Sequence, residues 1–139
     1  MDMNKILATK ESKLNFLKGL IRLSKSDGIT DKSEKDFFHQ AAVSMGLEEQ
    51  ECRKLDMIWK QEKDTIMISF ETTTEKMFFF VQAIQLCWID ESYTEDEKKE
   101  IQLLAKELGI SEEAIRSVEA WVAEGIEWNK KGDKLLFLS

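Results

Sequence analysis

Apolar residues recur at helical spacing along most of the chain. In residues 12–25 and 74–89 they fall at positions i, i+3 or i+4 and i+7, which is the pattern of a helix with one buried face. Each of these segments is followed by a short acidic connection and a second amphipathic segment, over residues 31–45 and 94–108. The pattern predicts an all-α protein in which this arrangement occurs twice.

Local signals mark the ends of the predicted helices. Thr94 and Glu97 have the S/T-x-x-E spacing of a capping box, which favours a helix start at this point. Gly46 and Gly109 follow the second helix of each arrangement and are typical residues for ending a helix. A third helix is expected to begin soon after each glycine.

The pattern returns with a fixed offset, because Asp27 and Asp90 lie 63 positions apart and so do many other identical pairs. The pairs that match without a gap include Phe16/Phe79, Ile21/Ile84, Leu23/Leu86, Glu34/Glu97, Lys35/Lys98, Gly46/Gly109, Glu49/Glu112 and Arg53/Arg116. Two copies of one three-helix unit predict a pair related by a pseudo-twofold axis rather than a solenoid, which needs more repeats.

We expect one domain over residues 1–139, with a first copy over about 12–60, a linker over 61–73, a second copy over about 74–128 and a tail over 129–139. The linker is expected to be extended and to pack Ile66, Ile68 and Phe70 onto the helices. The last helix is expected to run through Trp121 to about Trp128, before Lys131 and Gly132 break it. The apolar segment 135–138 either docks back onto the core or forms an exposed patch for a partner.

Composition narrows the range of functions. The chain has 27 acidic and 20 basic residues, a formal net charge of −7 and no proline. This balance argues against nucleic-acid binding and against anionic membrane surfaces, both of which favour clusters of Lys and Arg. The most apolar stretch, residues 77–89, is too short for a membrane span of roughly 20 residues. No secretory signal is visible, and we expect no membrane insertion.

The sequence contains no recognisable catalytic motif, and we expect a protein that is not an enzyme. Cys52 and Cys87 form no CxxC motif, and both are expected to be reduced. His39 is the only histidine and is interpreted as a surface or half-buried packing residue. The four tryptophans are interpreted as core or interface anchors: Trp59, Trp88, Trp121 and Trp128.

The two acidic connections carry the candidate chemistry. In each, an Asp at the end of one helix is followed seven residues later by a Glu in the first turn of the next. If the copies pack about a twofold axis, Asp27, Glu34, Asp90 and Glu97 converge and offer oxygen ligands for Ca²⁺ or Mg²⁺. The alternative is that these carboxylates only cap helices. An EF-hand is excluded, because its first ligand positions would be Leu23 and Lys25.

The motifs together resemble the TerB-like (tellurite-resistance B) family. The resemblance rests on Ser26-Asp27-Gly28 with Glu34, on Asp90 with Glu97, and on the Gly46 and Gly109 motifs, and it covers about residues 14–122. It implies about seven helices with internal pseudo-twofold symmetry in a cytoplasmic bacterial protein. It further implies metal binding through the acidic loops, action in protein complexes and a role in tellurite or other chemical stress. Ser26 and Glu91 depart from the family pattern, which has Ala and Gly there.

Two functions therefore follow from the sequence. The first is a TerB-like binding module that holds a divalent cation weakly through Asp27, Glu34, Asp90 and Glu97 and assembles with protein partners in a stress response. The second is a metal-free structural or interaction protein that uses the apolar C-terminal segment as its interface.

Overall fold

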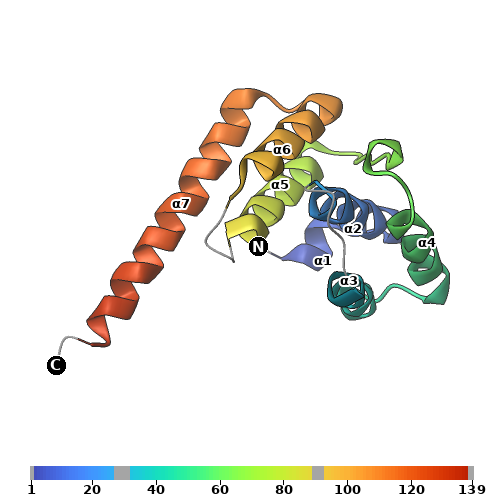
Figure 1. The fold of residues 1–139 in the computed structure, drawn as a ribbon, viewed down its shortest axis with the longest axis horizontal. Coiled ribbons are helices and arrows are strands. Elements are labelled where there is room, and N and C mark those ends of the chain that lie inside the picture. Colours follow the sequence, from blue (N-terminus) through green and yellow to red (C-terminus); the bar gives the residue numbers. More distant parts are fainter. Residues whose placement is uncertain (1, 27–31, 89–92, 138–139) are drawn as a thin grey trace.

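The structure is a computed structural model and describes residues 2–26, 32–88 and 93–137, with the side chains of residues 32–34 excluded. This part of the chain is all-helical and has no strand, which confirms the predicted all-α class (Figure 1). Its elements are α1 (Met3–Ile6), α2 (Lys10–Ser24), α3 (Lys32–Ser44), α4 (Glu49–Trp59), the 3-10 turn η1 (Lys63–Thr65), α5 (Thr73–Trp88), α6 (Glu95–Leu108) and α7 (Glu112–Leu135). Among the described helices, none combines the length and the apolar character needed to cross a bilayer.

Two helices from different halves of the chain, α2 and α5, contact each other in the middle of the molecule. Helix α2 also packs against α3 and α4, and α5 also packs against α6 and α7. In Figure 1, α4 and α7 therefore lie at opposite edges with α2 and α5 between them. The order of the helices along the chain is the order expected from the sequence pattern.

The core is centred on aromatic residues where α2 meets α5. Phe79 is fully buried, and its ring centroid lies 6.0 Å from that of Phe16 and 5.8 Å from that of Phe70. Gly19 on α2 makes this close approach possible, because a Cβ at Gly19 would lie 2.4 Å from a carbon of the Phe79 ring. Such a contact is too short for any side chain, so Gly19 sets how closely α2 and α5 pack.

Glycine ends the second helix of each half in the same way. Gly46 and Gly109 adopt φ angles of 80° and 73°, the left-handed conformation that favours glycine. The N–H of Leu47 donates to the carbonyl of Ala42 at 3.0 Å, and the N–H of Ile110 makes the corresponding bond to the carbonyl of Ala105 at 2.8 Å. These are Schellman motifs, and they confirm the helix ends predicted at both glycines.

The segment between α4 and α5 packs against the helices as expected. Ile66 is fully buried, Ile68 is buried and Phe70 is half-buried in the core. The backbone N–H of Ser69 donates to the side-chain oxygen of Asn15 on α2 at 3.0 Å, which holds the extended segment in place. The turn η1 at the start of this segment was not predicted.

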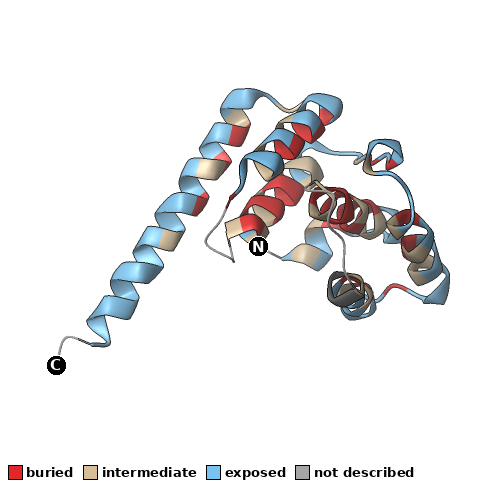
Figure 2. Cartoon of the chain, in the orientation of Figure 1, coloured by how far each residue is buried: buried red, intermediate tan, exposed pale blue. Residues whose placement is uncertain are grey.

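The predicted end of the last helix was wrong. Helix α7 does not stop near Trp128 but continues to Leu135, so Gly132 lies within it and residues 129–135 are not a separate tail. A glycine inside a helix costs only about 1 kcal/mol relative to alanine and does not by itself break the helix. No residue of α7 beyond Val122 is buried, and this half of α7 extends away from the other helices (Figures 1 and 2).

Candidate functional site

Most of the predicted acidic site lies outside the described residues. Asp27 and Asp90 belong to the connections that the structure does not describe, and Glu34 lies in α3 without a described side chain. Glu97 is the member of the set whose side chain is described. Convergence of the four carboxylates on Ca²⁺ or Mg²⁺ therefore stays a prediction.

The carboxylate of Glu97 caps its own helix. Its Oε1 atom accepts hydrogen bonds from the backbone N–H of Thr94 at 2.9 Å and from the Thr94 hydroxyl at 3.0 Å. In return, the backbone N–H of Glu97 donates to the Thr94 hydroxyl at 3.2 Å. This reciprocal pair is the capping box predicted at the start of α6, and it is confirmed.

Substitution of Glu97 separates capping from metal binding. Because a glutamine oxygen can accept the same hydrogen bonds, Glu97→Gln is expected to change the free energy of unfolding by less than about 0.5 kcal/mol, whereas Glu97→Ala should lower it by about 1 kcal/mol. Urea denaturation at neutral pH measures both. The same titrations with added Ca²⁺ or Mg²⁺ test the ion site. Stabilisation of the wild-type chain by either ion, lost in Glu97→Gln, would show that the carboxylate does more than cap.

The two cysteines lack the properties of catalytic thiols. Both are free, as the sequence predicted; Cys87 is buried and Cys52 is half-buried. Burial raises the pKa of the Cys87 thiol, and the nearby carboxylate of Glu97 raises it further. Burial and the charge of Asp56 likewise raise the pKa of Cys52. Both groups are therefore protonated thiols at neutral pH rather than thiolate nucleophiles.

His39 takes part in a small charged cluster between α3 and α4. Its Nε2 atom lies 2.7 Å from Oδ1 of Asp56, and the Nζ atom of Lys35 lies 3.7 Å from the same oxygen. The hydrogen bond with His39 lowers the pKa of Asp56. His39 is half-buried and lines an open hollow, in agreement with its predicted place near the surface.

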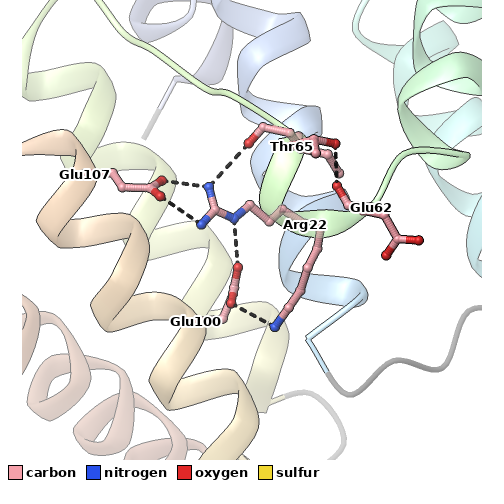
Figure 3. Close-up of polar contacts among 7 residues, drawn as sticks. Arg22, Glu62, Thr65, Glu100 and Glu107 are labelled. Carbon is pink, nitrogen blue, oxygen red and sulfur yellow. Dashed lines mark hydrogen bonds and ion pairs between the residues drawn. The ribbon is translucent and has the colours of Figure 1, made fainter.

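A buried arginine is the polar feature that the sequence analysis missed (Figure 3). Only 1% of the Arg22 side chain is exposed, and its Nε atom donates to Oε1 of Glu100 at 2.7 Å. Its Nη1 and Nη2 atoms donate to the two carboxylate oxygens of Glu107 at 2.6 and 3.1 Å, and Nη1 also donates to the carbonyl of Ile66 at 3.3 Å. Lys63 lies 3.4 Å from the other oxygen of Glu100.

This network joins three separate parts of the chain. Arg22 comes from α2, Glu100 and Glu107 come from α6, and Ile66 comes from the segment that connects the two halves. Burial by itself lowers the pKa of Arg22, but the hydrogen bonds and charges of Glu107 and Glu100 outweigh it and hold the pKa above its ordinary value. Because the guanidinium donors are directed at groups of the chain itself, we interpret the network as structural rather than as an anion site.

An apolar surface on α5 and α7 is the remaining candidate. Trp121 lines two open hollows. The Trp121 surface comprises Met77, Val81, Trp88, Ala114, Trp121 and Ile126. Trp121 is about half exposed, so it is not a core residue. Of the two roles predicted for the tryptophans, core residue or interface anchor, only the interface anchor remains for Trp121.

Comparisons of the chain with protein-family models, with curated proteins and with solved structures found no match. The assignment of a site therefore rests on the geometry of the molecule.

Further large apolar residues are exposed beyond the Trp121 surface, on α7 and directly after it. Trp128 is 75% exposed, and Leu135, Leu136 and Phe137 at the end of the helix are also largely exposed. Leu135, Leu136 and Phe137 therefore do not dock back onto the core and are exposed, as in the second of the two predicted alternatives, whereas Leu138 lies outside the described residues. Isolated apolar residues are common on protein surfaces, but several large ones on one helix indicate a candidate site of interaction.

Proposed function

We propose that the chain is a protein-interaction module and that α7 is its docking element. The observation that carries the proposal is the half of α7 beyond Val122, which has no buried residue and yet presents Trp128 and Leu135 to solvent. The sequence predicts an interaction function for the apolar C-terminal segment. The proposal keeps that function but assigns it to helix α7 instead of to a separate tail.

The stability of α7 supports this proposal. Most of the stability of a helix in a protein comes from the packing of its apolar face against other elements. The half of α7 beyond Val122 has no tertiary packing in this chain except at the half-buried Ile126. A partner that covers its apolar side chains would stabilise the helix and remove the exposed tryptophan from water.

We include in this proposal that the chain is TerB-like and that its two halves arose by internal duplication. Both are supported by the matched Schellman motifs at Gly46 and Gly109 and by the packing of α2 with α3 and α4, which parallels that of α5 with α6 and α7. A TerB-like module of this kind would act in a cytoplasmic protein complex during chemical stress. Weak binding of Ca²⁺ or Mg²⁺ through the acidic connections is a separate hypothesis, tested by the Glu97 titrations above.

Site-specific photo-crosslinking in cells tests the interaction function. A photoreactive phenylalanine analogue in place of Trp128 is expected to form covalent protein adducts, because this position would face a partner within van der Waals distance. The same analogue in place of Lys99, which is exposed on α6, is the matched control and should form few adducts. Equal yields at the two positions, or none at Trp128, would argue that α7 does not dock to a partner.

A further inference from the structure

The exposed side of α7 carries a regular sequence of large and small residues. Trp121, Gly125, Trp128, Gly132 and Leu135 are separated alternately by four and three positions. We call these five residues the α7 seam, and all five are exposed. An alternating spacing of four and three averages 3.5 residues, which is the repeat that keeps one face of a helix against a second helix in a coiled coil.

The two glycines of the α7 seam have no explanation within the chain. Neither has a positive φ, and a Cβ at Gly125 or Gly132 would meet nothing within 4 Å. Each glycine makes an exposed helix less stable than alanine would. A glycine on the surface of a helix instead leaves space in which a large side chain of another molecule can pack.

The charges of α7 change sign along its length. The part up to Glu127 is acidic, with Glu112, Glu113, Glu119, Glu124 and Glu127 against Arg116, and the part after it is basic, with Lys130, Lys131 and Lys134 against Asp133. A second copy of the helix in the same direction would bring like charges together. A second copy in the opposite direction would bring the lysines against the glutamates.

One antiparallel register pairs large residues with small ones and also pairs opposite charges. It places Trp121 opposite Gly132 of the second copy and Trp128 opposite Gly125 of the second copy, so each indole enters the space that a glycine leaves. In the same register Lys131 of one copy, which flanks the α7 seam, lies beside Glu124 of the other.

The register also gives the end of the second helix an apolar surface to contact. In the same register Leu135 of the second copy comes beside Val118, at the open hollow lined by Met77, Val81, Ala114 and Trp121. The exposed surface of that hollow is almost entirely apolar. The end of the second helix, with its exposed leucines, therefore meets an apolar surface on α5 and α7.

We infer that α7 pairs with α7 of a second copy of this chain, antiparallel about a twofold axis, with the tryptophans of each α7 seam packed on the glycines of the other. The inference rests on the proposed function and names the partner. A twofold interface uses the same patch on both copies, so every contact occurs twice.

Sedimentation equilibrium of the 139-residue chain at increasing protein concentration tests the inference. The wild-type chain is expected to form dimers, and Trp128→Ala to raise the dissociation constant by about 30-fold or more, as for a central tryptophan of an interface. Gly125→Leu should abolish dimers by filling the space for the indole. Leu103→Ala, at a half-exposed leucine on α6, is the control and should leave the dissociation constant unchanged. Circular dichroism checks that each variant remains folded.

Exchange of charges tests the direction of the helices. In the proposed register Glu124 lies close to Lys131 of the second copy, so Glu124→Lys and Lys131→Glu should each weaken the dimer. An equimolar mixture of these two variants should restore dimers to the wild-type level, because every pair again has opposite charges. Dimers that are insensitive to Trp128→Ala and Gly125→Leu would overturn the inference. A monomeric wild-type chain whose Trp128 position crosslinks to another protein would also overturn the inferred α7 pairing, but it would leave the proposed interaction function intact. The absence of any crosslink at Trp128 would overturn both the pairing and the interaction function.

Discussion

Replacement of Arg22 by methionine is expected to lower the free energy of unfolding by about 3–5 kcal/mol, since it leaves a buried carboxylate without its partner. Glu100 is only 3% exposed and depends on the guanidinium for its 2.7 Å ion pair. Lys63 is a poor replacement for the guanidinium, because its Nζ atom lies 3.4 Å from the Glu100 carboxylate and its side chain is more exposed than that of Arg22. Urea denaturation followed by circular dichroism measures the loss.

The same substitution at Arg53 provides the control. Arg53 forms an ion pair with Glu49 at 2.8 Å, but both side chains are largely exposed, so Arg53→Met should change the free energy of unfolding by less than about 0.5 kcal/mol. The double variant Arg22→Met with Glu100→Leu should recover most of the loss, because an apolar pair fills the space of the buried ion pair. Equal effects at Arg22 and Arg53 would mean that burial of the network does not matter for stability.

Phe79→Ala is the second substitution with a large expected effect, a loss of about 3–5 kcal/mol in the free energy of unfolding. The ring is fully buried, and its centroid lies 5.1 Å from that of Phe80. Because the ring lies directly over Gly19, its removal opens a cavity at the point where α2 and α5 approach most closely. Thermal and urea unfolding report the change.

Phe37 serves as the comparison for Phe79, because it is also a phenylalanine but about half of its side chain is exposed. Phe37→Ala should lower the free energy of unfolding by less than about 1 kcal/mol. A milder variant, Phe79→Leu, keeps the experiment informative if Phe79→Ala fails to fold. A loss below 1 kcal/mol for Phe79→Ala would contradict the position of this ring at the centre of the core.

Features that depend on neighbouring residues could be predicted from the sequence. A glycine after a run of helix-forming residues ends a helix through local backbone geometry, and Gly46 and Gly109 do so. The capping box of Thr94 and Glu97 is equally local. The alternation of Ile66 and Ile68 also predicted correctly which side of the connecting segment faces the core.

Features that depend on distant residues could not be predicted. Nothing near Arg22 in the sequence indicates Glu100 or Glu107, although an arginine between Ile21 and Leu23 in an apolar helix was a signal that it has a buried partner. The end of α7 was placed too early because Gly132 was interpreted as a stop. The spacing of Trp121, Trp128 and Leu135 at intervals of seven shows that the helical pattern continues through it.

The Arg22 network also affects how the protein is made. Arg22 and Glu100 are 78 positions apart, so at 5–20 residues per second the ribosome takes about 4–16 s to add Glu100 after Arg22. During that time α2 can meet α3 and α4, but its arginine has neither of its carboxylates. The first half of the chain therefore emerges with an unpaired charge at the place where its core must close, and it reaches its final packing only when the second half arrives.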